Sequence, residues 1–229
     1  MNFNKKLIKY IAKKTVKYRY KGVGLILKHL TPVLYDQIDI KTFSTRNFKL
    51  KLESYNQLIR PSINFMKEFF KEKLVKGCEI GIAQGIHSES IIKHLNIEKL
   101  YLIDIWDNYE GNNWLWAQHS YKLVQKKFKN DSRIIIKKAY SKNAIKDIQD
   151  NSLNFIYIDG NHQYEYVYQD ISLWYSKLKI NGVMAGHDIC LSNVMNAVKD
   201  FCFNKKINFK IEIPDWYFIK EKGDERCYD

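Results

Sequence analysis

The chain has 229 residues, with 38 lysines and arginines against 25 aspartates and glutamates, for a formal net charge of +13. This length is enough for one domain with a sizeable core, and the apolar and charged fractions are typical of a globular protein. The four cysteines, at 78, 190, 202 and 227, form no CxxC pair, which argues against a zinc finger and a disulfide scaffold. No run approaches the roughly 20 apolar residues that span a bilayer, so we expect a cytoplasmic protein.

The net charge is concentrated in the first quarter of the chain. Residues 1–60 carry 14 basic and 3 acidic residues, a net +11, whereas residues 61–229 carry 24 and 22. Apolar side chains recur at helical spacing from Phe3 to Val16 with lysines between them, which predicts a basic amphipathic helix. Such a helix can pack on the main domain, which we favour, attach to the inner face of an anionic membrane, or form a homo-oligomer contact.

From residue 62 the pattern alternates between strands and helices. Helices are expected at 62–75, 88–95 and 114–128, from 142, after 160 and from 193. Strands are expected at 78–82, 99–106, 133–139, 153–160, 181–188, 208–214 and 216–222. This order predicts an α/β three-layer sandwich with a mostly parallel seven-stranded sheet. The last two strands are too close for a helical crossover, so we expect them to pair antiparallel.

The first strand-to-helix turn, Gly81 to Gly85, indicates a ligand site. It lacks the G-x-G-x-x-G spacing that seats a pyrophosphate and the lysine of a P-loop, which disfavours a dinucleotide or a nucleoside triphosphate. Glu79 places an anion beside the turn. Asp104 ends the next strand, where a carboxylate can accept hydrogen bonds from both ribose hydroxyls. These features favour a nucleoside that carries positive charge instead of phosphate, and S-adenosylmethionine fits that description.

Polar side chains follow the fourth and fifth predicted strands. The fourth ends in Asp159-Gly-Asn-His162 and the fifth in Gly-His187-Asp188. A hydroxyl group accepts a methyl group only after losing its proton, to a histidine base or with the help of a divalent ion. His162 is the candidate base, and Asp159 and Asp188 offer the oxygen ligands that Mg²⁺ prefers. The alternative is that Asp159 contacts only the cofactor and His162 caps the following helix.

At these positions the chain resembles the class I S-adenosylmethionine-dependent methyltransferases. The stretch CEIGIAQG is similar to their first motif, with Glu79, Gly81 and Gly85, and LYLIDIW is similar to their second, with Asp104 as the ribose-binding acid. Trp106 follows the ribose acid and is a candidate for a ring against the adenine; the alternative is that the stretch 106–121 forms a helix packed on the sheet edge. The resemblance implies that the turn AYSKNA, with Tyr140 and Ser141, borders the adenine. Residues 61–229 would then form a cofactor-binding domain behind a basic helical extension, residues 1–60.

The stretch from Phe155 to Ile189 resembles a branch that includes sugar and macrolide O-methyltransferases. The resemblance implies that Asp159 and Asp188 bind a metal, with Asp159 in the catalytic set beside the base His162. His187 departs from the branch, which more usually has an acidic residue there. An imidazole can ligate Mn²⁺, which weakens the case for Mg²⁺. The implied reaction is methylation of a hydroxyl of a sugar, glycan or small natural product.

Two other functions remain open at this point. A nucleic-acid methyltransferase would suit the basic N-terminus, although residues 61–229 are nearly neutral and lack the Pro-Pro-aromatic motif of base N-methylation. A nucleotide-binding oxidoreductase would suit the strand–helix alternation, although its glycine spacing is absent. The sequence therefore favours a small-molecule or glycan acceptor over nucleic acid.

Overall fold

The structure is a computed structural model that describes residues 59–107 and 114–223. The predicted basic helix and the rest of residues 1–58 lie outside these ranges. From Ile59 onward the described residues belong to one compact unit. None of the helices within it is long and apolar enough to cross a membrane.

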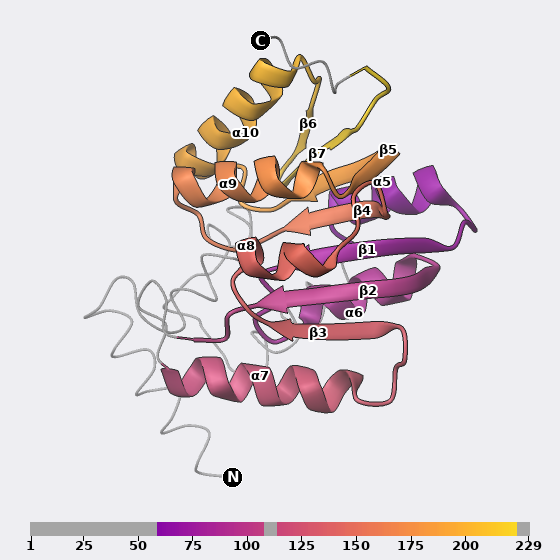
Figure 1. Cartoon of the computed structure of the whole chain (residues 1–229), viewed down its shortest axis with the longest axis vertical. Helices are drawn as coiled ribbons and strands as arrows, with labels where there is room; N and C mark the ends of the chain where they lie inside the picture. The colour runs from indigo at the N-terminus through magenta and orange to yellow at the C-terminus, as the bar shows by residue number, and fades with distance from the viewer. Residues whose placement is uncertain (1–58, 108–113, 224–229) are drawn as a thin grey trace, which may run out of the picture. The chain divides into compact units, whose positions relative to one another are not determined.

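A seven-stranded sheet forms the middle layer, in the order β3-β2-β1-β4-β5-β7-β6 (Figure 1). The first five strands pair in parallel, and β7 pairs antiparallel with both β5 and β6. This confirms the predicted fold class, including the terminal antiparallel hairpin. The strands are β1 (Val75–Ile80), β2 (Ile97–Asp104), β3 (Ile134–Lys138), β4 (Leu153–Ile158), β5 (Leu178–Gly186), β6 (Lys210–Glu212) and β7 (Asp215–Ile219).

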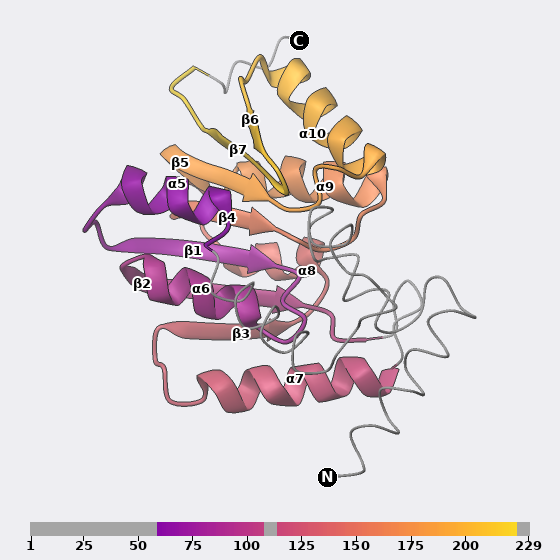
Figure 2. The same cartoon turned by 180° about the vertical axis from the view of Figure 1, so that it is seen from behind.

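Helices cover both faces of the sheet, as Figures 1 and 2 show from opposite sides. One apolar cluster joins the sheet to α5 (Pro61–Phe70), α6 (Ile86–His94) and α7 (Trp114–Phe128). The other joins it to α8 (Ser141–Ala144), α9 (Tyr164–Tyr175) and α10 (Ser192–Lys205), and a short 3₁₀ turn, η1 (Ile145–Asp147), follows α8. The central strand β4 is buried along its whole length, whereas the two edge strands, β3 and β6, are half-buried and exposed, respectively.

The first predicted helix was too long. It ends at Phe70, because Lys71 adopts a left-handed backbone conformation (φ 51°) that a helix cannot continue through. Val75, which fits a helical pattern, is fully buried and pairs with Ile97 at the start of β1. Local periodicity does not separate a short buried strand from the end of a helix.

The strand order reverses between β1 and β4, since β2 and β3 follow on one side and β5 on the other. In parallel sheets such a reversal opens a crevice at the carboxyl ends of the two strands, where ligands bind. The turn after β1 and the polar residues after β4 therefore face the same crevice.

Candidate active site

Two glycines shape the turn between β1 and α6. Gly81 has φ 86° and Gly85 has φ 72°, a region that side chains with a Cβ rarely adopt. A Cβ on Gly81 would lie 2.0 Å from the carbonyl oxygen of Asp159. The turn after β1 is thus packed directly on the backbone that carries the polar residues after β4, and the two halves of the predicted site meet.

Asp104 holds this turn in place. Its Oδ2 accepts hydrogen bonds from the backbone N–H groups of Ile82 (2.8 Å) and Ala83 (3.0 Å). Its Oδ1 accepts one from the backbone N–H of Trp106 (2.8 Å). A carboxylate has about four lone-pair positions, so these three bonds leave about one position for a ribose hydroxyl. The ribose contact itself stays a prediction.

Trp106 lies beneath the turn. Its side chain is buried, its Nε1–H donates to the carbonyl of Ala83 (2.9 Å), and its ring packs 4.9 Å from that of Tyr121. The ring therefore supports the turn from the core side. An adenine would have to contact a face of this ring, and the ring is buried in the structure. The predicted contact of Trp106 with adenine stays a prediction.

Glu79 is also enclosed. Its carboxyl group accepts a hydrogen bond from the Ser88 hydroxyl (2.5 Å) and lies 2.9 Å from His87 Nδ1. Burial raises the pKa of Glu79 to about 8, so at neutral pH the group is mainly protonated. The predicted anion beside the turn is therefore a buried, largely neutral group, which organises the start of α6. Its predicted contact with the cofactor stays a prediction.

The turn after β3 carries two further predicted cofactor residues. Tyr140 is exposed, and its carbonyl accepts the backbone N–H groups of Asn143 and Ala144. The Ser141 hydroxyl donates to the carboxyl group of Asp170, a buried residue of α9. Asp170 thus ties the turn to α9. No local sequence pattern signals this contact.

Asp170 predicts a pH-dependent stability. Burial raises its pKa to about 6, partly offset by the bond from Ser141. Because the folded protein binds this proton more tightly than the unfolded chain, whose aspartate pKa is about 4, the protonated carboxyl group contributes its full stability below pH 4. This contribution is lost as the pH rises through about 6. We expect Asp170→Asn to keep the acceptor for Ser141. As the pH rises from about 4 to about 6, the free energy of unfolding of this variant should come to exceed that of the wild type by about 1–3 kcal/mol.

Melting temperatures of both proteins at several pH values test this prediction. The difference between them should widen from acid to neutral pH, whereas the control Glu68→Gln, at an exposed position of α5, should show no such widening. A constant difference would mean that Asp170 is not destabilised by ionisation.

Three ionisable side chains meet beyond β4 and β5. The possible ligand atoms of Asp159, His162 and Asp188 all lie within 4.8 Å of one another. His162 Nε2 lies 2.8 Å from Asp188 Oδ2, and all three side chains are partly accessible. Two carboxylates and one imidazole are a donor set that suits Mn²⁺ and, less well, Mg²⁺. We call Asp159, His162 and Asp188 the acid–histidine cluster.

His187 lies behind this cluster. Its Nδ1 is 3.2 Å from Asp188 Oδ1 and 3.7 Å from Asp159 Oδ1, and its side chain is almost fully buried. Burial opposes the ionisation of Asp188, but the hydrogen bonds with His162 and His187 outweigh it and hold the pKa of Asp188 far below its usual range. Asp188 is therefore an anion at neutral pH. Metal ligation by His187 stays a prediction.

A buried polar network connects the cluster to the start of α5. Arg60 Nη1 donates to the hydroxyl of Tyr157 (2.6 Å) and to Asp159 Oδ2 (3.0 Å). The Tyr157 hydroxyl donates to Asp215 Oδ1 (3.1 Å), and Asp215 Oδ2 accepts the backbone N–H of Ser62 (3.2 Å). Sequence reasoning missed this network, because it joins residues up to 153 positions apart.

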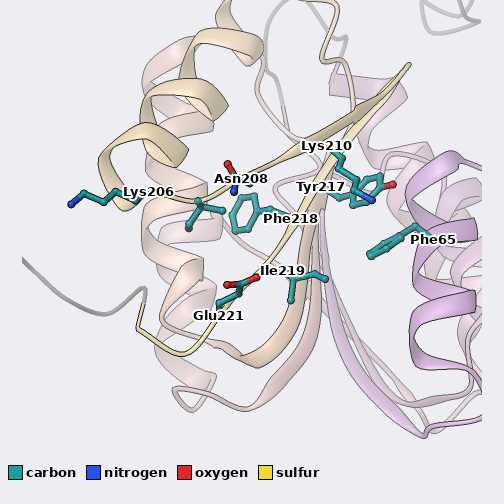
Figure 3. Close-up of a pocket in the computed structure, with 9 residues that line it drawn as sticks. Phe65, Lys206, Asn208, Lys210, Tyr217, Phe218, Ile219 and Glu221 are labelled. Atoms are coloured by element: carbon teal, nitrogen blue, oxygen red, sulfur yellow. The ribbon is translucent and has the colours of Figure 1, made fainter.

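A cavity of about 230 Å³ is lined by none of the residues of the acid–histidine cluster (Figure 3). It lies beside α5, β6 and β7, and Figure 3 shows Phe65 and Tyr217 on one side and Phe218 and Glu221 on another. A small second cavity touches the acid–histidine cluster through Asp159 and His162. The chemistry of the site therefore rests on its functional groups and not on cavity size.

The family comparison supports a methyltransferase. Residues 78–189 match the family model described as a methyltransferase domain, and they run from β1 to just beyond Asp188. The matched segment therefore contains the glycine turn, Asp104 and the whole acid–histidine cluster. No curated protein matches the chain.

Solved structures share the fold at low sequence identity. The O-methyltransferase NovP is 14% identical with a TM-score of 0.53, covering 70% of this chain and 80% of its own. A protein from Corynebacterium glutamicum is 10% identical with a TM-score of 0.54, covering 73% and 83%. A putative caffeoyl-CoA O-methyltransferase from Staphylococcus aureus is 12% identical with a TM-score of 0.53, covering 85% and 99%. These similarities support the fold.

Proposed function

We propose that the chain is a class I S-adenosylmethionine-dependent methyltransferase that methylates a hydroxyl group of a sugar, glycan or small natural product, since residues 78–189 match a methyltransferase-domain family model. The observation that carries this proposal is the acid–histidine cluster beside the glycine turn. A base and two carboxylates at this place suit an acceptor whose proton must be removed before it can react. Two of the structurally similar proteins are named O-methyltransferases, which agrees with this choice.

The chain's own residues would hold the cofactor at the carboxyl ends of β1 and β2. S-adenosylmethionine supplies an electrophilic methyl group on a sulfonium. The left-handed glycines let a ligand approach the backbone closely, and Asp104 fixes the turn and would accept a ribose hydroxyl at its remaining lone-pair position. The enclosed Trp106 and Glu79 keep the turn rigid, so little ordering is left to occur on binding.

His162 is proposed as the base. Asp188 is ionised and lies 2.8 Å from His162 Nε2, so a neutral imidazole keeps its proton on Nε2 and carries the lone pair on Nδ1. The carboxylate also stabilises the imidazolium that forms when the ring accepts the acceptor's hydroxyl proton. The pair thus orients the base and raises its basicity.

Asp159 and Asp188 are the residues that would hold a divalent cation, Mg²⁺ or Mn²⁺. Such an ion lowers the pKa of a hydroxyl bound to it. Arg60 engages Asp159 Oδ2, which leaves Oδ1 as the oxygen on the side of His187. The metal is tested by calorimetry of S-adenosylmethionine binding and by turnover, each with and without EDTA followed by Mn²⁺. Full turnover in EDTA would show that no metal ion takes part in the reaction, and the proposal would then rest on His162 as the base.

Asp104→Ala tests the cofactor site. The substitution removes the acceptor of three backbone N–H groups and the proposed ribose contact. Since hydrogen bonds to a charged group contribute about 1.5–3 kcal/mol, we expect binding of S-adenosylhomocysteine to weaken by about 10–100-fold. Calorimetry on the variant and on the surface control Asp131→Ala measures this. Unchanged affinity in Asp104→Ala would remove Asp104 from the cofactor site.

The acceptor class is tested by a panel. Neutral sugars, nucleotide sugars, glycans and RNA are incubated with the enzyme and a radiolabelled methyl donor. The proposal predicts label on a hydroxyl of a carbohydrate. Label on RNA alone would replace the proposal with a nucleic-acid methyltransferase, the alternative suggested by the basic N-terminus.

A further inference from the structure

Arg60 brings a permanent positive charge to the acid–histidine cluster. It precedes α5, and its guanidinium group lies over the ring of Tyr157, 5.5 Å from the ring centre. Both of its hydrogen bonds, to Tyr157 and Asp159, come from a single nitrogen, Nη1. In the proposed reaction this charge has no role beyond holding Asp159.

The other edge of the same guanidinium group remains available. Within the described residues, Nε and Nη2 donate to no acceptor, and 23% of the side-chain surface is exposed. Nε and Nη2 form the planar fork with which arginine binds a carboxylate or a phosphate through two parallel hydrogen bonds. The pair with Asp159 and Tyr157 holds this fork in a fixed orientation, so little side-chain entropy remains to be lost on binding.

The charges around Arg60 favour an anionic ligand when the metal ion and the cofactor are bound. A divalent cation on Asp159 and Asp188 would offset their two negative charges, so that Asp215, joined to Arg60 through the Tyr157 hydroxyl, remains to offset the charge of Arg60. The sulfonium of the cofactor adds another positive charge. A neutral hydroxyl acceptor gains nothing from this field, whereas an acceptor with an anionic group close to its reacting hydroxyl is attracted.

We propose that Arg60 binds an anionic group of the acceptor, so that the preferred substrate is an acidic or phosphorylated sugar. This inference rests on the proposed function and narrows its acceptor. The shared chemistry is an oxygen anion with two acceptor atoms, which either a uronic acid or a sugar phosphate supplies. Arg60 would thereby select the acceptor and place its hydroxyl beside His162.

The test compares three probes on the full chain with S-adenosylhomocysteine and Mn²⁺ bound. Ligand-observed NMR measures the binding of methyl glucuronoside, a hexose phosphate and methyl glucoside. Both anionic probes, or one of them, should bind at least about tenfold more tightly than the neutral glucoside. The stronger anionic probe identifies the carboxylate or the phosphate as the natural group.

Three variants separate the charge of Arg60 from its structural contacts. Arg60→Met should abolish the preference for anions, Arg60→Lys should retain part of it, and Tyr157→Phe should keep it, because the guanidinium group stays paired with Asp159. Lys76→Met, which removes an exposed lysine paired with Glu98, should also keep it. Should Arg60→Met fail to fold, the wild-type preference and the Arg60→Lys variant decide the question.

Equal binding of neutral and anionic probes, no binding of either anionic probe, or an unchanged preference in Arg60→Met would overturn this inference. The proposed function would survive each of these results if methyl transfer to a neutral sugar is still observed. Failure to bind S-adenosylhomocysteine at all would instead overturn the proposed function.

Discussion

Replacing His162 with alanine is expected to lower turnover by about 10²–10⁴-fold, the usual contribution of a general base. Cofactor affinity should change little, since the glycine turn and Asp104 keep their contacts. Asp188 loses its bond to His162 but keeps the neighbouring His187 Nδ1 at 3.2 Å, so the fold should persist. Single-turnover rates with saturating acceptor, together with calorimetry of S-adenosylhomocysteine, measure the two quantities separately.

The matched control for this variant is His94→Ala. His94 lies on α6, where its ring bonds the backbone carbonyl of Ser90 (2.8 Å), away from the cluster. Its replacement should leave turnover unchanged. A titration with Mn²⁺ separates a base from a ligand, because a base leaves metal affinity intact. Full turnover in His162→Ala across the pH range would refute the assignment of the base.

Replacing Gly81 with alanine is expected to cost about 2–5 kcal/mol of folding stability and to abolish cofactor binding. The new Cβ would meet the carbonyl oxygen of Asp159 at 2.0 Å and its carbonyl carbon at 2.4 Å, which are backbone atoms that cannot rotate away. The left-handed φ of 86° adds about 1–2 kcal/mol, and overpacking adds about 1–3 kcal/mol. The melting temperature should fall by about 4–20 °C.

Gly160→Ala is the control for this prediction, one residue beyond Asp159. A Cβ there would meet only Ile80 Cγ2 at 3.7 Å and Asp170 Oδ2 at 3.8 Å, which are ordinary contacts. We therefore expect it to fold and to bind the cofactor. Equal melting temperatures for Gly81→Ala and Gly160→Ala would show that the turn after β1 does not pack on the end of β4.

The fold could be predicted from the sequence because each strand carries its own signal. The segment around Phe155 is an unbroken apolar run, and the structure buries β4 completely. The helix with Val167, Ile171 and Trp174 shows a 3.6-residue apolar period, and all three side chains are buried. The ends of the helices and strands have weaker sequence signals than their centres. The helix α5 ends at Phe70, before the left-handed Lys71, and no local pattern in the sequence marks this end.

The candidate site could be predicted only in part. Asp159, His162 and Asp188 follow parallel strands, so the topology alone brings them to one edge, and the structure groups them. Arg60 and Asp215 could not be found this way. Their contacts depend on the packing of α5 against β4 and β7, which no local pattern encodes.

The enclosure of Glu79 and Trp106 also escaped sequence reasoning. The local sequence around a charged or aromatic residue beside a ligand-binding turn is the same whether its side chain faces the ligand or the core. The difference lies in partners that are distant along the chain, such as Tyr121 against the ring of Trp106. Burial then changes the chemistry, since it raises the pKa of Glu79 to about 8.

The most direct test of the account follows the methyl group itself. The full chain is incubated with a methyl donor labelled in its transferable carbon, Mn²⁺ and the sugar panel, and the labelled product is identified by NMR and mass spectrometry. We expect a methyl ether on a carbohydrate hydroxyl, formed by the wild type and lost in His162→Ala. A methyl group on nitrogen, sulfur or a nucleic-acid base, or the same ether formed at full rate by His162→Ala, would contradict it.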